Sequence, residues 1–442
     1  MSLSTPPETV QKLQKSLHAK AKSEPNFRFY SLWDKVCRTD VLRHAYRACR
    51  ANRGAPGVDG ETFEQIEEQG LDQWLGNLQQ ELKDKTYVPR PLRRKWIPKS
   101  NGGQRLLGIP AIRDRVVQAA VVVVLEPIFE ADLFQSQFGF RRGRDAKAAI
   151  RRVFFQVTRD GKTEVVDADL SDYFNTIPHG PLMKSVARRV SDGTVLSLIK
   201  AWLTVPEIEA TPRGTKRTTE ARDKGRGTPQ GGVISPLLSN LYFRRFLLAW
   251  HEHGHAKRLD AYVTNYADDL GVCCKPGHGR AAMAGMRRVM ERLGLTVNEE
   301  KTRIARLPEE SFEFLGYSFR RMYKRDGKAF IGTRPSRKAV RRVMRRIHDE
   351  TSRRWTNSTV EKRVEEVNRV VRGWCGYFDQ GPVGAEYQML TRYIAWRFRR
   401  WLEKKHRLRT RGTRRFRYAY LFDALGLIKP SALLDDPTRA KA

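Results

Sequence analysis

The sequence predicts an α+β protein in which an antiparallel sheet is followed by a helical C-terminal region. Two apolar segments, 259–265 and 270–274, flank Tyr266-Ala-Asp-Asp269, so we expect a hairpin with two carboxylates at its tip. Beyond Pro335, apolar side chains recur at the spacing of one helix face, at Val340, Val343, Met344 and Ile347. The change of pattern separates a part that contains a sheet from a part that is helical.

A second group of carboxylates follows a β-branched segment upstream of the hairpin. Residues 162–169 read Lys-Thr-Glu-Val-Val-Asp-Ala-Asp, which predicts a strand that ends at Asp169 and has Asp167 on the same face. An Asp-Asp turn by itself is usually only a polar turn. Beside a strand end that carries Asp169, however, Asp268 and Asp269 would complete a cluster of three carboxylates. Such a cluster can hold two divalent cations ~3.5–4 Å apart, which is what two-metal phosphoryl transfer requires.

Seven short motifs are spread over nearly the whole chain. Their ranges are Ala55–Gly60, Ile97–Pro110, Phe138–Arg144, Asp167–Asn175, Gly227–Pro236, Phe314–Phe319 and Gly373–Phe378. In this order they resemble the conserved blocks of bacterial group II intron-encoded reverse transcriptases with maturase activity. Many members of that family end in a zinc-supported endonuclease module. The Cys and His spacing of that module is not found after Phe378, so the resemblance is to the type that lacks the endonuclease.

This resemblance implies a right-hand polymerase fold with an antiparallel palm sheet and an α-helical thumb, or maturase, region. With the composition, it divides the chain into a basic helical leader (1–40), fingers (41–161), a palm with the catalytic carboxylates (162–330), a helical thumb/maturase region (331–390) and a basic nucleic-acid-binding segment (391–442). The implied activity is RNA-directed DNA polymerisation with two Mg²⁺ ions, for which Mn²⁺ is a substitute. The implied partners are intron RNA or another RNA template, a DNA primer, target DNA and deoxynucleoside triphosphates. Intron splicing and retrohoming are the associated roles.

The resemblance also assigns individual residues to the site. Asp169, Asp268 and Asp269 are expected to be the catalytic metal ligands. Four further residues are expected to bind the incoming nucleotide. Lys99 and Arg105, on opposite arms of a Gly-Gly turn, would contact the triphosphate; Phe174 would lie under the sugar and exclude a ribose 2′ hydroxyl; and Gln230 would contact the nucleotide or the nearby template–primer.

Basic and aromatic residues elsewhere are expected to contact nucleic acid. Arg141, Arg144 and Tyr266 are predicted to contact template or primer. Residues 391–417 hold 12 Lys/Arg and one acid, interleaved with aromatic side chains. This composition is typical of a surface that follows phosphates, and its candidates are Arg397, Arg399, Arg400, Lys404 and Lys405. Some of its aromatic residues, such as Trp396 and Trp401, could equally be core residues.

The bulk composition agrees with a nucleic acid partner. The 442 residues carry a formal charge of +35, and 40% of them are hydrophobic, enough to bury a core. No apolar run is long enough to span a bilayer, so we expect no membrane partner.

Five cysteines without a Cys-x-x-Cys pair favour a reducing cytoplasm and no structural zinc. His251, His253 and His255 could share a strand face and bind metal, but a polar connection is favoured because no acid or cysteine completes a ligand set. The sequence gives no prediction of homo-oligomerisation.

Several elements are expected from local patterns. Residues 110–129 predict a buried helix, and 211–226 a polar, basic loop. Ser358-x-x-Glu361 has the pattern of a capping box that opens a helix with an apolar stripe at Val360, Val364, Val367, Val371 and Trp374. Two other functions stay open at this stage: an RNA-binding splicing cofactor with minor polymerase activity, and a related enzyme recruited to host defence or DNA repair.

Overall fold

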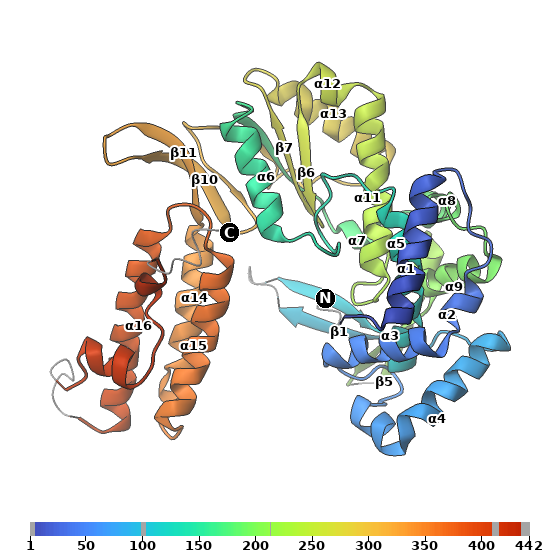
Figure 1. The fold of residues 1–442 in the computed structure, drawn as a ribbon, viewed down its shortest axis with the longest axis horizontal. Helices are drawn as coiled ribbons and strands as arrows, with labels where there is room; N and C mark the ends of the chain where they lie inside the picture. Colours follow the sequence, from blue (N-terminus) through green and yellow to red (C-terminus); the bar gives the residue numbers. More distant parts are fainter. Residues whose placement is uncertain (1–4, 99–102, 213, 409–414, 435–442) are drawn as a thin grey trace. The chain divides into compact units, whose positions relative to one another are not determined.

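The computed structural model describes residues 5–98, 103–212, 214–408 and 415–434, which form two compact units. Unit 1 comprises Met1–Asp145, Ala168–Leu270 and Arg280–Thr302, and unit 2 comprises Ala146–Asp167, Gly271–Gly279 and Arg303–Ala442. Both units contain helices and strands (Figure 1), and most of the strand pairs whose register is described are antiparallel. The mixed class predicted from the sequence is therefore confirmed.

The centre of unit 1 is the buried helix α5 (Ile112–Glu130). Valine and alanine side chains cover all sides of this helix, so it needs packing partners all round. These are α1 (Glu8–Ser23), α2 (Trp33–Val36) and α3 (Thr39–Ala51), and α4 (Phe63–Lys83) packs against α3. The buried helix predicted over 110–129 is confirmed.

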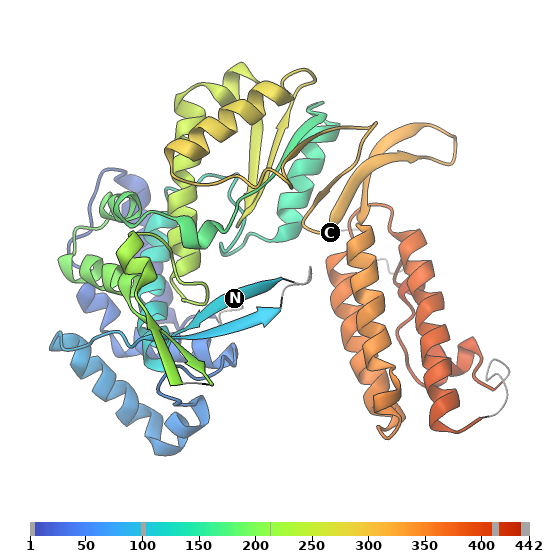
Figure 2. The same cartoon turned by 180° about the vertical axis from the view of Figure 1, so that it is seen from behind.

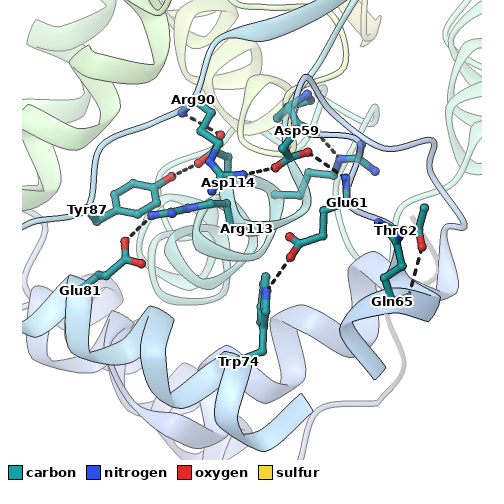
Figure 3. Close-up of polar contacts among 12 residues, drawn as sticks. Asp59, Glu61, Thr62, Gln65, Trp74, Glu81, Tyr87, Arg90, Arg113 and Asp114 are labelled. Atoms are coloured by element: carbon teal, nitrogen blue, oxygen red, sulfur yellow. Dashed lines mark hydrogen bonds and ion pairs between the residues drawn. The ribbon is translucent and has the colours of Figure 1, made fainter. Parts of the chain in front are cut away.

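A cluster of polar contacts fixes the start of α5 to the segment before the first strand (Figure 3). The buried carboxylate of Asp114 accepts a hydrogen bond from the Tyr87 hydroxyl at 2.6 Å and another from the Arg90 backbone N–H at 3.0 Å. Ion pairs join Arg90 to Asp59 and Arg113 to Glu81. Because these residues come from four chain segments, the cluster orients the strand that follows Arg90.

That strand belongs to a four-stranded sheet of order β2-β1-β4-β5. β1 (Leu92–Pro98) pairs antiparallel with β2 (Gln104–Ile109) and parallel with β4 (Glu207–Thr211), which pairs with β5 (Gly214–Thr218). The short helix α10 (Glu220–Lys224) follows. The loop predicted over 211–226 is therefore wrong. This segment forms an edge hairpin whose side chains are polar on both faces, so it lacks the alternation by which strands are recognised.

The remaining helices of unit 1 are α7 (Tyr173–Thr176), α8 (His179–Ala187), α9 (Gly193–Thr204), α11 (Ser235–Glu252), α12 (His255–Arg258) and nearly all of α13 (Gly279–Arg292). The three alternate histidines do not lie on a strand, because His251 is in the last turn of α11 and His255 begins α12. His255 is buried against Trp250, with ring centroids 5.0 Å apart. The interpretation as a connection, rather than a shared strand face, agrees with this placement.

The predicted acidic hairpin is present. β6 (Tyr262–Tyr266) and β7 (Asp269–Cys274) are joined through Ala267 and Asp268, in a sheet of order β6-β7-β3-β8. β3 (Glu164–Asp169) therefore neighbours β7 and pairs on its other side with β8 (Arg303–Arg306). Val165, Val166 and Ala168 of β3 are buried, as are residues 270–274 of β7, consistent with a sheet covered on both faces.

Unit 2 combines helix α6 (Ala146–Thr158), a three-stranded sheet and a helical bundle. The sheet has the order β11-β10-β9, with β9 (Phe312–Phe314), β10 (Tyr317–Tyr323) and β11 (Ala329–Pro335). The bundle contains α14 (Arg337–Glu350), α15 (Val360–Tyr377) and α16 (Gly384–Lys405), which lie side by side (Figure 2). A short helical turn at Arg353–Trp355 lies between α14 and α15, and two more follow α16 at Tyr420–Ala424 and Pro430–Leu434.

The stripes predicted for α14 and α15 form the core of this bundle. Val343 and Ile347 pack with Val364, Val367 and Val371, and Val360 and Trp374 lie partly buried beside them. The cap of α15 differs from the prediction: Thr359, one residue after Ser358, caps the helix by accepting from the Lys362 N–H at 3.3 Å. The Ser358 hydroxyl instead accepts from the buried Arg363 side chain at 3.1 Å.

All five cysteines are free thiols and buried. Burial raises the pKa of Cys273 to about 12, so this thiol is protonated at neutral pH. Among the described residues, no helix combines the length and apolarity needed to cross a membrane.

Candidate active site

The hairpin turn that carries Asp268 and Asp269 is held in place from two sides. The Asn265 side-chain amide donates to the carbonyls of Ala267 at 2.7 Å and Asp269 at 3.4 Å. Ala267 itself has a left-handed backbone, with φ of 58°. On the other side, a Cβ on Gly139 would lie 2.5 Å from the Ala267 nitrogen, so only glycine permits this approach. The backbone of the turn that carries the two acids is therefore fixed.

Asp169 ends the neighbouring strand β3 and is already paired with a cation. Its Oδ2 accepts from the Lys301 ammonium at 2.8 Å and from the Asn298 amide at 3.1 Å. The hydrogen bond with Asp169 is the main cause that raises the pKa of Lys301, and the charges of Asp169, Asp268 and Asp269 add to it. All three carboxylates therefore lie near the same ammonium group.

Asp167 is separated from this group by its cross-strand partner. It lies opposite Arg303 in the β3–β8 register, and the Arg303 Nε is 4.0 Å from its Oδ2. The nearby Glu164–Arg306 pair repeats the arrangement with 3.2 Å between Nε and Oε1. Asp169 is therefore the carboxylate of β3 that bonds Lys301, the group on which the charges of Asp268 and Asp269 also act.

The donor chemistry of the three acids fits a divalent cation, since Mg²⁺ and Mn²⁺ prefer carboxylate oxygens. The side chains as they stand are not closed around one point. Within the described ranges, no group of three Asp, Glu, His or Cys side chains is arranged to hold a metal ion. Asp169 faces Lys301 instead, so a cation that bound Oδ2 would have to replace this ammonium.

Phe174 and Gln230 lie on two segments that are bonded to each other. The carbonyl of Phe174 accepts from the Thr228 N–H at 2.7 Å, and its partly exposed ring lies 6.2 Å from that of Phe140, edge to face. The carbonyl of Gln230 accepts from the Gly108 N–H on β2 at 2.8 Å. The next residue, Gly231, has φ of 120°, and a Cβ there would lie 2.5 Å from the Gly108 carbonyl oxygen. Glycine at 231 therefore allows this loop to join β2.

Of the two predicted triphosphate contacts, one can be placed. Arg105 is exposed on β2, opposite Ile97 of β1. Lys99 lies outside the described residues.

The predicted template and primer contacts divide into different environments. Arg141 is buried: its guanidinium pairs with Glu130 at 2.5 Å and donates to the carbonyls of Phe134 and Gln137. The structure therefore corrects its assignment, since the guanidinium group bonds other residues of the same chain and is not available to a nucleic acid. Arg144 is half-buried and donates to the Gln135 carbonyl at 2.8 Å. Tyr266 is partly exposed at the end of β6, and burial, then Asp145, raises its pKa.

The basic candidates on α16 also divide into two groups. Arg397, Arg399 and Lys405 each donate to backbone carbonyls of unit 2, of which the Phe416 carbonyl is 2.7 Å from Arg399 Nε. These three side chains therefore have structural roles, which corrects the sequence interpretation. Arg400 and Lys404 are exposed, and Arg400 lies over the exposed Trp396 ring, 5.3 Å from its centroid.

A more basic face lies on α14, whose arginines around the apolar stripe are already indicated by the sequence as candidates to contact a partner. Six side chains on this helix are exposed: Arg337, Lys338, Arg341, Arg342, Arg345 and Arg346. Within the described part of the chain, Arg346 alone among them has an ion-pair partner, Glu350. Their i, i+4 spacing around the predicted apolar stripe was the available signal. The sequence contains no indication of the roles of Lys301, Asn298, Asn265 and Gly139, because these roles depend on partners distant in sequence.

Carboxylates at a strand end and at the neighbouring hairpin turn, in a mixed α/β unit, define the class of nucleic acid polymerases that work with divalent cations. Comparison with known proteins agrees. Residues 97–319 match the family model described as reverse transcriptase (RNA-dependent DNA polymerase), and residues 340–419 match the group II intron maturase-specific domain. The chain belongs to the reverse transcriptase family, in the group that carries this maturase domain.

Individual relatives support the same family. Protein YkfC of Escherichia coli is 35% identical over 366 residues, which cover 75% of this chain and 93% of that protein. The group II intron-encoded protein LtrA of Lactococcus lactis is 31% identical over 217 residues, 48% of this chain and 34% of LtrA. Nuclear intron maturase 2 of Arabidopsis thaliana is 33% identical over 111 residues. The chain thus spans nearly all of YkfC but about a third of LtrA.

Proposed function

We propose that Asp169, Asp268 and Asp269 are the metal-binding carboxylates of an RNA-directed DNA polymerase of the group II intron type. The observation that carries this proposal is the 2.8 Å bond between Asp169 and Lys301, at the end of the strand that neighbours the hairpin with Asp268 and Asp269. The family uses divalent metal ions, and two Mg²⁺ ions, or Mn²⁺ in their place, are the proposed cofactors. When bound, such ions activate the attacking primer hydroxyl and stabilise charge on the transferred phosphate.

The surrounding residues would position the substrates. Arg105, with Lys99, supplies positive charge for the triphosphate of a deoxynucleotide. Gln230, fixed through its backbone to β2, is placed to contact the nucleotide or the template–primer pair. Phe174 presents an aromatic ring to the sugar, where a 2′ hydroxyl would meet it. Tyr266 and Arg144 are proposed to line the path of template and primer. Positioning of this kind accounts for much of the catalysis of phosphoryl transfer.

In the proposed layout, the β2-β1-β4-β5 sheet belongs to fingers, the β6-β7-β3-β8 sheet to a palm and α14–α16 to a thumb or maturase region. The partners would be intron RNA as template and splicing substrate, a DNA primer and target DNA. We propose that α14, with its row of exposed arginines, is the main nucleic acid surface of unit 2, and that α16 contributes Arg400 and Lys404. The maturase domain and the similarity to LtrA support a role in intron splicing, and retrohoming is proposed with it.

The test is primer extension on an RNA template by the variants Asp169→Asn and Asp268→Asn. Each removes one charged metal ligand, so we expect extension to fall by roughly 10²–10³-fold or more, since metal charge stabilisation contributes several kcal/mol. RNA affinity should change little, because binding depends on Lys and Arg. Glu300→Gln is the matched control, since it removes an exposed carboxylate next to Lys301. Undiminished extension by Asp268→Asn in Mg²⁺ would exclude that carboxylate from the site.

A further inference from the structure

The segment that carries Lys301 is bonded along the end of β3. The Ser171 N–H donates to the Thr296 carbonyl at 2.9 Å, Leu170 forms a β-bridge with Val297, and the Asn298 N–H donates to the Asp169 carbonyl at 2.8 Å. The backbone after α13 is thus tied to the residues around Asp169. Lys301 is therefore brought to the carboxylate by the fold, and does not meet it only through the freedom of a long side chain.

At Asp169 the protein itself supplies a cation, which is the ammonium group of Lys301. Lys301 and Asn298 both donate to the same oxygen, Oδ2, at 2.8 and 3.1 Å. The Asp169 side chain is 26% exposed and that of Lys301 is 61% exposed. The ammonium is therefore held at one end only and can leave towards solvent. A lysine suits such a role because it is a single point charge on a flexible stem, whereas arginine would bind the carboxylate with a rigid fork.

We propose that Lys301 is a resident counter-cation of the carboxylate cluster, which a divalent cation must displace from Asp169. This inference rests on the proposed metal site. Three carboxylates that converge without a metal repel one another, and Lys301 relieves this repulsion. Its ammonium and a metal ion compete for Oδ2. Lys301 is thus a positioning residue that acts through Asp169: it preserves the arrangement of the acids before metal arrives and lowers their apparent affinity for it.

The first experiment measures metal affinity directly, with Mn²⁺ as the probe and electron paramagnetic resonance as the readout of free ion. Lys301→Gln should bind Mn²⁺ more tightly, by roughly two- to fivefold, because exposed lysine–carboxylate pairs are weak. Lys301→Arg, which keeps the charge, should not tighten binding. A purely structural lysine predicts the opposite sign, since its loss would disorder the acids and weaken binding. Unchanged or weaker Mn²⁺ binding by a folded Lys301→Gln protein, checked by thermal melting, overturns the proposal.

Arg303→Gln is the matched control for long-range charge. It removes one positive charge two residues further on, from a side chain that pairs with Asp167. If direct competition at Oδ2 operates, this variant should change Mn²⁺ affinity less than Lys301→Gln does. Equal tightening by the two variants would show that general electrostatics, and not occupancy of Asp169, sets the affinity.

The second experiment detects the displacement in the unmodified protein. Amine-reactive labelling read by mass spectrometry should show Lys301 more reactive in saturating Ca²⁺ than in chelator, because the metal takes its carboxylate partner. Lys224, whose partner Glu220 is on the same short helix, is the internal reference. Constant or lower reactivity of Lys301 overturns the proposal. Asp169→Asn distinguishes failure of the proposed metal site from failure of this inference about Lys301. This variant should lose Mn²⁺ binding. If it still binds Mn²⁺, the proposed function itself is contradicted.

Discussion

At Phe174, packing and the proposed selection of the sugar depend on one ring. The ring is partly exposed and contacts Phe140 and Tyr173 edge to face, so its orientation is fixed while one side stays open. Phe174→Ala should increase ribonucleotide incorporation relative to deoxynucleotide by about ten- to hundredfold, since steric overlap costs about 1–3 kcal/mol. The ratio of single-nucleotide insertion efficiencies measures this.

Phe140→Ala is the control for this prediction. It removes the neighbouring ring and leaves Phe174 in place, so sugar discrimination should change much less. If both variants leave the discrimination ratio at its original value, Phe174 is a packing residue and does not act on the sugar.

The sequence indicates which acidic residues belong to the site, but it does not indicate which cationic residue lies beside them. Asp169, Asp268 and Asp269 could be grouped because each follows a recognisable strand. Lys301 could not, because its carboxylate partner lies 132 residues away and a lysine in a polar segment has no pattern of its own. Arg141 was misassigned for the same reason: its burial depends on Glu130 and on carbonyls that local sequence does not place.

Among the elements, the junction of α5 with the segment before β1 contains a buried acid with a testable pH dependence. Burial is the main cause that raises the pKa of Asp114 to about 6, against hydrogen bonds from Tyr87 and the Arg90 N–H. The folded protein therefore binds this proton more tightly than the unfolded chain does. The resulting stability is fully present below the unfolded pKa of 3.8 and is lost as pH rises through about 6.

We expect the wild-type protein to lose up to about 3 kcal/mol relative to Asp114→Asn between pH 4 and pH 7.5, from a shift of about two pKa units. Urea unfolding of both proteins at several pH values gives this difference, and other titrating groups cancel in the comparison. Glu220→Gln, on the exposed helix α10, is the control: the hydrogen bond with Lys224 lowers the pKa of Glu220, so any trend should have the opposite sign. A difference between wild type and Asp114→Asn that does not vary with pH would contradict the assignment.

The elements that sequence predicted well are rich in apolar residues that become buried. α5 is apolar on all sides, the β6–β7 hairpin has two apolar strands, and α14 and α15 each have an apolar stripe. The β4–β5 hairpin was missed because β5 is polar on both sides and is specified by pairing: β4 joins β1 through Leu92 opposite Glu207. Local residue patterns contain no information about such a partner.

For the whole molecule, the important question is where the excess positive charge is available to nucleic acid. From residue 331 onward there are 28 Lys/Arg and 11 Asp/Glu. The sequence suggested a basic segment that starts at Thr391, yet this residue is buried within α16. Phe398 and Trp401 lie in the same core as Ile347 and Val371, so removal of the segment would open the bundle. Charge on this bundle must therefore be tested by substitution on its surface.

Two matched double variants distinguish the two candidate surfaces. Arg341→Gln with Arg345→Gln removes two charges from exposed positions on α14, and Arg400→Gln with Lys404→Gln removes two from α16. Each phosphate contact adds about −0.7 (single strands) or −0.9 (duplex DNA) to the slope of log K against log salt. If α14 is the main surface, the first variant should flatten this slope by roughly 1.4–1.8 on a structured RNA or a primer–template, while the second changes it by less than about half as much. Filter binding at several salt concentrations provides the slopes, and thermal melting confirms that both proteins stay folded. The reverse order would assign the main contact to α16, and two unchanged slopes would mean that the basic faces of this bundle are only solvated.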